Sequence, residues 1–85
     1  MWYVYALKSL KDSNLYIGMS ENPEKRLQQH NLGMTRSTKH RRPFRIIYKE
    51  RCENRINARK REKYLKSGSG REFLKDFSNK QNMPL

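Results

Sequence analysis

The chain has 85 residues, of which 34% are hydrophobic, and its 20 Lys and Arg residues outnumber 8 Asp and Glu residues, giving a formal net charge of +12. This length allows one domain with a small core, and no segment approaches the length of a membrane span. The positive charge is spread along the whole chain and favours a polyanionic partner, with nucleic acid ahead of an acidic membrane surface.

Cysteine usage and the first residues indicate the compartment. The chain has a single cysteine, Cys52, so an internal disulfide and a zinc site built from cysteine pairs are both excluded. Residues 1–7 lack the basic segment, the long apolar segment and the small-residue cleavage site of a signal peptide. We therefore expect a cytoplasmic protein in a reducing environment.

Two short runs rich in aromatic and β-branched residues open the chain, over residues 2–7 and 15–19. A polar loop separates them, so we expect the two runs to pair as a hairpin. Because side chains alternate along a strand, Tyr3 and Tyr5 share one face of the first strand.

The register of this hairpin decides whether two phenols share a site. If the pairing is centred between Leu10 and Lys11, Tyr5 lies directly opposite Tyr16. Aromatic residues are also what any half-buried strand favours, so core packing is the alternative interpretation of both tyrosines.

The first helix is predicted from Asn22, which can cap it, and Pro23, which suits the first helical position, to about Asn31. Within it, Arg26 and His30 are four residues apart and therefore project from the same face. Beside a sheet that carries tyrosines, this spacing places a guanidinium and an imidazole over the same spot.

Residues 33–43 are polar and strongly basic and show no helical or strand period, which predicts a loop. Its basic and hydroxyl side chains are good donors to phosphate, although a solvated surface turn is the alternative. Residues 44–50 follow as a third strand with an apolar centre.

The second helix is predicted over residues 53–67, and its inner stripe contains a carboxylate. Ala58 and Leu65 lie seven residues apart on that stripe, and Glu62 lies between them on the same side. A carboxylate facing a core is costly unless it is paired or binds a metal. Ion pairs with neighbouring Arg and Lys residues are the alternative, and helix geometry alone slightly favours them.

A short third helix is predicted over residues 71–77, and residues 78–85 carry no pattern and are expected to fray. The pieces predict a single α+β domain over residues 1–77, in which three helices flank a three-stranded sheet in the order β-β-α-β-α-α.

Four motifs of this chain, taken together, resemble the GIY-YIG nuclease domain, and most of all its small stand-alone bacterial members. They are Tyr3-Val4-Tyr5, Tyr16-Ile17-Gly18, the run from Arg26 to Asn31, and the run from Glu62 to Lys66. One such motif would be a weak signal, but four in the correct order at fitting separations are a strong one. The resemblance covers about residues 2–77. The chain departs from the family where Tyr3 replaces the first motif glycine and where Met19 stands at a position that is lysine in some members.

The resemblance implies hydrolysis of a DNA phosphodiester that depends on one divalent metal ion, Mg²⁺ or Mn²⁺. By position, Tyr5 and Tyr16 match the motif tyrosines, Arg26 the helix arginine and Glu62 the glutamate that holds the metal. His30 falls where many members have histidine. The lysine proposed as proton acceptor in some members has no counterpart in this chain.

The proton acceptor for such a reaction would be Tyr5 or Tyr16. A phenol with a pKa of about 10 is almost entirely protonated at pH 7. Arg26, the metal and the positive field of the chain would all favour the phenolate, and His30 offers a second acceptor near neutrality.

The remaining basic residues predict contacts that follow the DNA backbone or its structure and do not read base sequence. The residues expected to bind phosphates are Arg36, Lys39, His40, Arg41, Arg42, Arg59 and Lys66. A non-catalytic DNA- or RNA-binding module with the same fold is the alternative, and a ribonucleoprotein component is a weaker one because it leaves Glu62 unexplained. An additional protein partner is left open.

Overall fold

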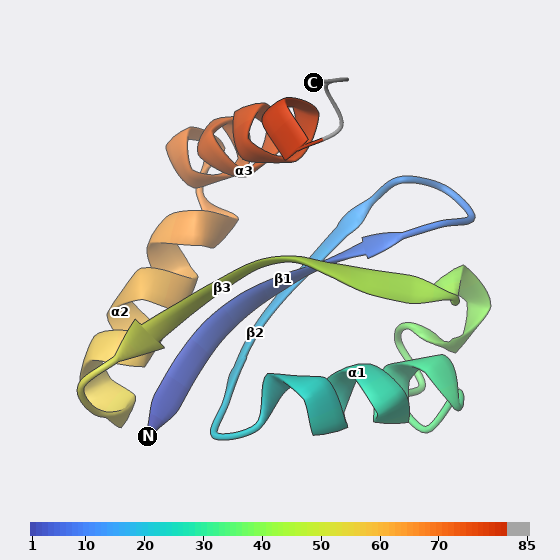
Figure 1. The fold of residues 1–85 in the computed structure, drawn as a ribbon, viewed down its shortest axis with the longest axis horizontal. Coiled ribbons are helices and arrows are strands. Elements are labelled where there is room, and N and C mark those ends of the chain that lie inside the picture. The colour runs from blue at the N-terminus through green and yellow to red at the C-terminus, as the bar shows by residue number, and fades with distance from the viewer. Residues whose placement is uncertain (82–85) are drawn as a thin grey trace.

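The computed structural model describes residues 1–81 and has the predicted α+β architecture (Figure 1). Its elements are β1 (Trp2–Ser9), β2 (Leu15–Ser20), α1 (Pro23–Asn31), a 3₁₀ turn η1 (Lys39–Arg41), β3 (Phe44–Cys52), α2 (Arg55–Lys66) and α3 (Gly68–Gln81). The predicted order β-β-α-β-α-α is confirmed, and each strand ends one or two residues later than the sequence pattern indicated.

The three strands form one antiparallel sheet in the order β2-β1-β3, with β1 in the centre. The predicted hairpin register is wrong by two residues, because Tyr5 pairs with Gly18 and Tyr16 pairs with Leu7. The reason lies in the turn, where β1 continues to Ser9 and the Ser9 N–H donates to the Asn14 carbonyl at 2.9 Å. A shift of two residues keeps every side chain on its face, so both tyrosines still lie on the same side of the sheet.

The two faces of the sheet are covered by different helices (Figure 1). On the side of α2 and α3 lies the larger apolar cluster, and on the side of α1 lies a smaller one that contains Tyr5, Leu7 and Phe44, with Leu27 of α1 packed against it. The buried residues of the larger cluster are Val4, Ala6, Ile17, Ile47, Cys52, Ala58, Leu65 and Leu74. Within residues 1–81, no helix combines the length and the apolarity needed to cross a membrane.

The first helix begins as the sequence predicts. The Asn22 side-chain oxygen accepts a hydrogen bond from the Lys25 N–H at 3.1 Å, and Pro23 occupies the first turn, where its missing N–H costs nothing. Helix α2 starts in the same way, since Asn54 caps it by accepting from the Asn57 N–H at 2.8 Å. These caps fix where the two helices that carry the candidate site residues begin.

The basic segment over residues 33–43 is held more firmly than a solvated loop. The Asn31 side chain makes two hydrogen bonds with the backbone of Phe44, accepting from its N–H at 2.7 Å and donating to its carbonyl at 3.1 Å. The Ser9 hydroxyl donates to the Arg41 carbonyl, which ties η1 to the hairpin. These partners lie far apart in the sequence, so no local pattern indicated them.

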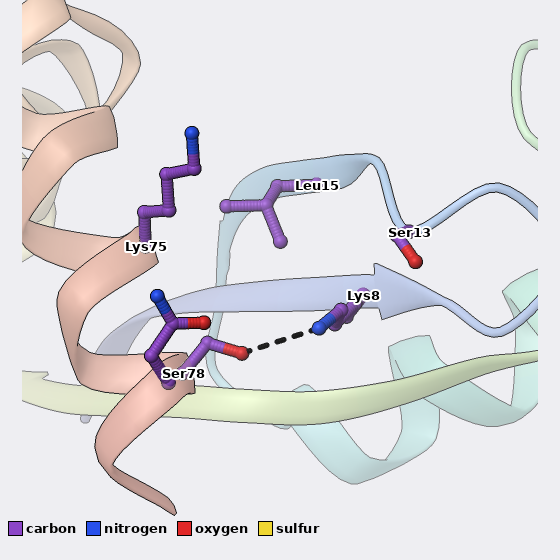
Figure 2. Close-up of a pocket in the computed structure, with 6 residues that line it drawn as sticks. Lys8, Ser13, Leu15, Lys75 and Ser78 are labelled. Carbon is purple, nitrogen blue, oxygen red and sulfur yellow. Dashed lines mark hydrogen bonds between the residues drawn. The ribbon is translucent and has the colours of Figure 1, made fainter. Parts of the chain in front are cut away.

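Helix α3 is longer than predicted at both ends, because it spans Gly68–Gln81 and not residues 71–77. The expectation that the chain frays from residue 78 is therefore wrong for residues 78–81, and residues 82–85 lie outside the described part. Ser78 is buried, and the Lys8 ammonium donates to its hydroxyl at 3.4 Å, which links the last turns of α3 to β1 (Figure 2).

Candidate active site

The two motif tyrosines meet over Gly18. Tyr5 is only 1% exposed, and a Cβ atom added to Gly18 would lie 2.7 Å from the Tyr5 hydroxyl oxygen and 3.3 Å from a ring carbon of Tyr16. Only glycine leaves room for the phenol at this place in β2. The predicted convergence of Tyr5 and Tyr16 is therefore present, reached through a diagonal arrangement and not through direct pairing.

Burial raises the pKa of the Tyr5 hydroxyl above its ordinary value. A hydrogen bond from Arg26 opposes this effect, and the nearby Tyr16 and Glu62 add to it. We expected Arg26 and the overall positive charge to favour the phenolate, but the cost of burying a phenolate outweighs them. Tyr5 therefore keeps its proton at neutral pH.

Arg26 projects from α1 toward Tyr5 and is half-buried. Its Nη1 atom donates to the side-chain oxygen of Gln29 at 2.8 Å, one turn further along the helix. This bond restricts the guanidinium, which suits a group that recognises phosphate oxygens. Sequence spacing predicted the position of Arg26 but did not identify Gln29 as its hydrogen-bond partner.

Glu62 lies on the inner face of α2 together with Ala58 and Leu65, as the spacing predicted, and is only 7% exposed. Its two oxygens lie 3.3 Å from Arg59 Nη1 and 3.5 Å from Lys66 Nζ, and both basic side chains are about half exposed. The carboxylate is thus turned inward and ion-paired, as the alternative favoured by helix geometry predicted, and metal binding by Glu62 stays a prediction. Its charge reaches the Tyr5 hydroxyl and contributes to the raised pKa there.

His30 is fully buried behind Tyr16. Its ring centroid lies 4.7 Å from that of Tyr16 and 5.9 Å from that of Phe44. Nδ1 is 2.8 Å from the Thr38 hydroxyl, and Nε2 has no hydrogen-bond partner among the described residues. Burial lowers the pKa of His30, and the charge of Arg26 lowers it further, so the imidazole is neutral at pH 7.

The carboxylate of Glu62 determines which metals the site fits. Among residues 1–81, no three His, Cys, Asp or Glu side chains gather closely enough to hold a metal ion. An ion at Glu62 would take one carboxylate from the protein and its other ligands from water and substrate, which suits Mg²⁺ or Mn²⁺. Structural zinc, which requires four protein ligands, does not fit these residues.

The residues predicted to bind phosphates lie in two groups. Arg59 and Lys66 flank Glu62 on α2, and on the basic segment four predicted residues are exposed, namely Arg36, Lys39, His40 and Arg42. Arg41 differs from these four, because its Nε lies 3.4 Å from the Asp12 carboxylate and its guanidinium lies 5.8 Å from the centre of the Phe44 ring. These contacts give Arg41 a structural task, and DNA binding by all of these residues stays a prediction.

Comparison with known proteins agrees with this arrangement. A family model described as the GIY-YIG catalytic domain matches residues 1–76. A UPF0213 protein of Clostridium perfringens is 41% identical over 81 residues, covering 94% of this chain and 86% of its own length. A UPF0213 protein of Staphylococcus saprophyticus is 39% identical over 77 residues, with 89% and 93% covered, and one of Syntrophus aciditrophicus is 40% identical over 74 residues, with 85% and 84% covered.

No solved structure matches the chain significantly. The match to the family model nevertheless spans β1 to the middle of α3, and so includes the strands and helices that carry Tyr5, Tyr16, Arg26 and Glu62. The relatives match along most of their own length, which indicates a domain of similar size in each. On these grounds, the chain belongs to the GIY-YIG catalytic domain family.

Proposed function

We propose that this protein is a divalent-metal-dependent DNA endonuclease that hydrolyses phosphodiester bonds. The observation that carries the proposal is the meeting of an arginine, a carboxylate and a second tyrosine around the buried hydroxyl of Tyr5, from four different elements. Membership of a family of nuclease catalytic domains supports the same activity.

Arg26 is the group that would bind the scissile phosphate. Phosphodiester hydrolysis places extra negative charge on the phosphate oxygens in the transition state, and a planar guanidinium can bond two of them at once. The bond between Arg26 and Gln29 holds the side chain in place before substrate arrives. This preorganisation means that less free energy is spent on orienting the guanidinium during the reaction.

The two tyrosines would have different tasks. Tyr5 is protonated, so its hydroxyl would donate to a phosphate oxygen or to the attacking water and hold it in position. Tyr16 is less buried than Tyr5 and would lie nearer the proton transfer. His30 is fully buried and would act only through Tyr16, against whose ring it packs.

Glu62 would hold a single Mg²⁺ or Mn²⁺ together with water molecules and a substrate oxygen. Such an ion supplies positive charge to the phosphate and lowers the pKa of bound water. Arg59 and Lys66, which pair with Glu62 in the protein alone, are exposed enough to turn toward DNA phosphates when an ion takes over the carboxylate.

The substrate would be recognised mainly through its backbone. The groups that would donate hydrogen bonds to DNA phosphates are Arg59 and Lys66 on α2 and the exposed residues of the basic segment. Such contacts position DNA without reading its sequence. If about six phosphates are neutralised, affinity should fall on the order of a thousandfold between 50 and 200 mM salt. The preferred DNA structure is to be found by comparing branched, nicked, flapped and single-stranded substrates.

The test compares the wild type with Glu62→Ala on these substrates in Mg²⁺ or Mn²⁺. Glu53→Ala is the matched control, because it removes an exposed carboxylate just before the same helix. We expect cleavage by the wild type and the control and none by Glu62→Ala. Absence of cleavage by all three, with binding that weakens as salt rises, would favour a non-catalytic DNA- or RNA-binding module. Equal cleavage by all three would point to a contaminating nuclease or to a different metal site.

A further inference from the structure

Thr38 lies just before η1 and is only 1% exposed, although the segment around it is polar and mostly exposed. We infer that Thr38 is a positioning residue for the site, whose hydroxyl holds His30 as the tautomer with its proton on Nδ1 and leaves Nε2 as a free acceptor. Its effect on cleavage rests on the proposed function, whereas the tautomer itself does not.

The inference starts from the two contacts of one hydroxyl. Thr38 Oγ1 lies 2.8 Å from His30 Nδ1 and 3.4 Å from the Thr35 carbonyl oxygen. A hydroxyl has one proton to donate, and a carbonyl can only accept. If the proton goes to Thr35, the hydroxyl must accept from His30, and Nδ1 must then carry the hydrogen. The Thr35 carbonyl also accepts the backbone N–H groups of Thr38 and Lys39, at 3.1 and 3.0 Å, so the hydroxyl adds a third and longer hydrogen bond to this oxygen.

The other tautomer makes one hydrogen bond fewer. If Nε2 carried the hydrogen, the Thr38 hydroxyl would donate to Nδ1 and lose its bond to Thr35. The Nε2–H would then be a buried donor without an acceptor, because His30 is 0% exposed and Nε2 has no partner among the described residues. A buried donor without a partner is costly, so the hydrogen-bond inventory favours the proton on Nδ1.

The position of the His30 ring affects the position of Tyr16, because the two rings pack against each other. The imidazole is held at Nδ1 by Thr38 and packed between the rings of Tyr16 and Phe44. Without the hydroxyl, the imidazole can turn about its own axis, and the ring of Tyr16 loses a fixed neighbour. A displacement of about 1 Å in a catalytic group can reduce a rate about 100-fold, so a residue outside the reacting set can control the rate.

The test uses Thr38→Val, which keeps the shape and removes the hydroxyl, and Thr38→Ser, which keeps the hydroxyl. Nitrogen-15 NMR of the imidazole reports which ring nitrogen carries the proton, whether or not the protein cleaves DNA. We expect wild type and Thr38→Ser to show the proton on Nδ1, and Thr38→Val to show a mixture of both tautomers. Cleavage should fall about 100-fold in Thr38→Val and stay within a few-fold of wild type in Thr38→Ser, with DNA binding unchanged in both.

Thr35→Val is the matched control, because this neighbouring threonine contributes its carbonyl and not its hydroxyl. It should keep the wild-type tautomer and the wild-type rate. A wild-type proton on Nε2 would overturn the inference, and so would a Thr38→Val variant with the Nδ1 tautomer and full cleavage. If Thr38→Val does not fold, the wild type and Thr38→Ser still decide the tautomer. If the wild type shows the Nδ1 tautomer but cleaves no DNA, the proposed function fails while the assignment of His30 stands.

Discussion

Tyrosine, arginine and glutamate meet twice in this domain, once around Tyr5 and once around Tyr48, and the two clusters differ in how fully their polar groups are paired. In the second cluster the Tyr48 hydroxyl donates to the Glu50 carboxylate, and Arg61 Nε lies 3.0 and 3.1 Å from its two oxygens. Around Tyr5, the carboxylate of Glu62 makes longer contacts, to Arg59 and Lys66 at 3.3 and 3.5 Å.

Aromatic rings surround the cluster at Tyr48. The Tyr48 ring packs edge-on against Phe73 and Phe77, with centroids 5.5 and 5.2 Å away, and the Arg61 guanidinium lies 4.9 Å from the Tyr64 ring centre. Burial raises the pKa of Tyr48, as it does for Tyr5. Identical residue types therefore make short contacts with one another around Tyr48, whereas around Tyr5 the carboxylate is paired through longer contacts with other residues.

The first prediction from this comparison concerns the two arginines. Arg26→Ala should lower the cleavage rate by at least about 100-fold while weakening DNA binding only a few-fold, because it removes charge from the transition state more than from the bound substrate. Arg61→Ala should lower stability and leave the rate of the folded protein unchanged. Rates under single-turnover conditions and binding isotherms for both variants test this. Equal losses of rate and affinity in Arg26→Ala would mean that Arg26 binds the substrate phosphate without stabilising the transition state further.

A second prediction uses two glycines. Gly18→Ala would place a methyl group 2.7 Å from the Tyr5 hydroxyl oxygen, so the phenol must move, and we expect cleavage to fall about tenfold or more. Gly68→Ala meets no atom within 4 Å and should leave the rate unchanged. Rates measured on the same substrate, together with thermal unfolding, separate displacement of Tyr5 from general loss of structure. A Gly18→Ala variant with the wild-type rate would show that the position of Tyr5 is not critical.

A third prediction compares what happens when each of the two carboxylates loses its charge. Glu50→Gln breaks a paired cluster and should cost about 1–3 kcal/mol in the free energy of unfolding, with little effect on cleavage. Glu62→Gln should cost less than about 1 kcal/mol, because Arg59 and Lys66 are exposed enough to be hydrated, and it should abolish cleavage. Urea unfolding measures both free energies. The distinction between the clusters would be lost if the two substitutions reversed this order.

The smallest predicted effect depends on pH. The pKa of His30 is lowered in the folded protein, so His30 contributes stability that is present above the unfolded pKa of about 6.5 and is lost as the pH falls through the folded value. The free energy of unfolding should decrease as the pH falls from 7.5 toward 5, and His30→Gln should remove part of that dependence. His40→Gln is the matched control, because His40 is exposed. A pH dependence that is unchanged in His30→Gln would contradict the assignment.

Patterns local in sequence predicted much of this domain. The cap residues Asn22 and Pro23 located α1, and the seven-residue spacing of Ala58 and Leu65 placed Glu62 on the inner face of α2. The hairpin register could not be obtained in this way, because a shift of two residues leaves the alternation of side chains unchanged. The length of α3 was missed because Gly, Ser and Asn at its ends are poor helix formers, and contacts such as that between Lys8 and Ser78 are tertiary.

The protonation states and supporting contacts of the candidate site were harder to predict than the identity of its residues. Sequence motifs named Tyr5, Arg26 and Glu62, but the direction of the Tyr5 pKa shift depends on how deeply the phenol is buried. The supporting contacts of Gln29 and Thr38 were missed for another reason. Polar residues in a helix or a loop are common, and only the folded chain shows which of them touch a site residue.

The two hydrogen bonds between the Asn31 side chain and the Phe44 backbone bear on how such a domain can diversify. Because it joins the end of α1 to the start of β3 directly, the residues between them do not have to hold those two elements together. Lengthening the segment just before Thr35 should therefore be tolerated, since an insertion there leaves the hydrogen bonds between the Thr35 carbonyl and the N–H groups of Thr38 and Lys39 intact and each doubling of a loop costs only about 0.6 kcal/mol. Members of the family can then differ in length at this position while α1 stays joined to β3.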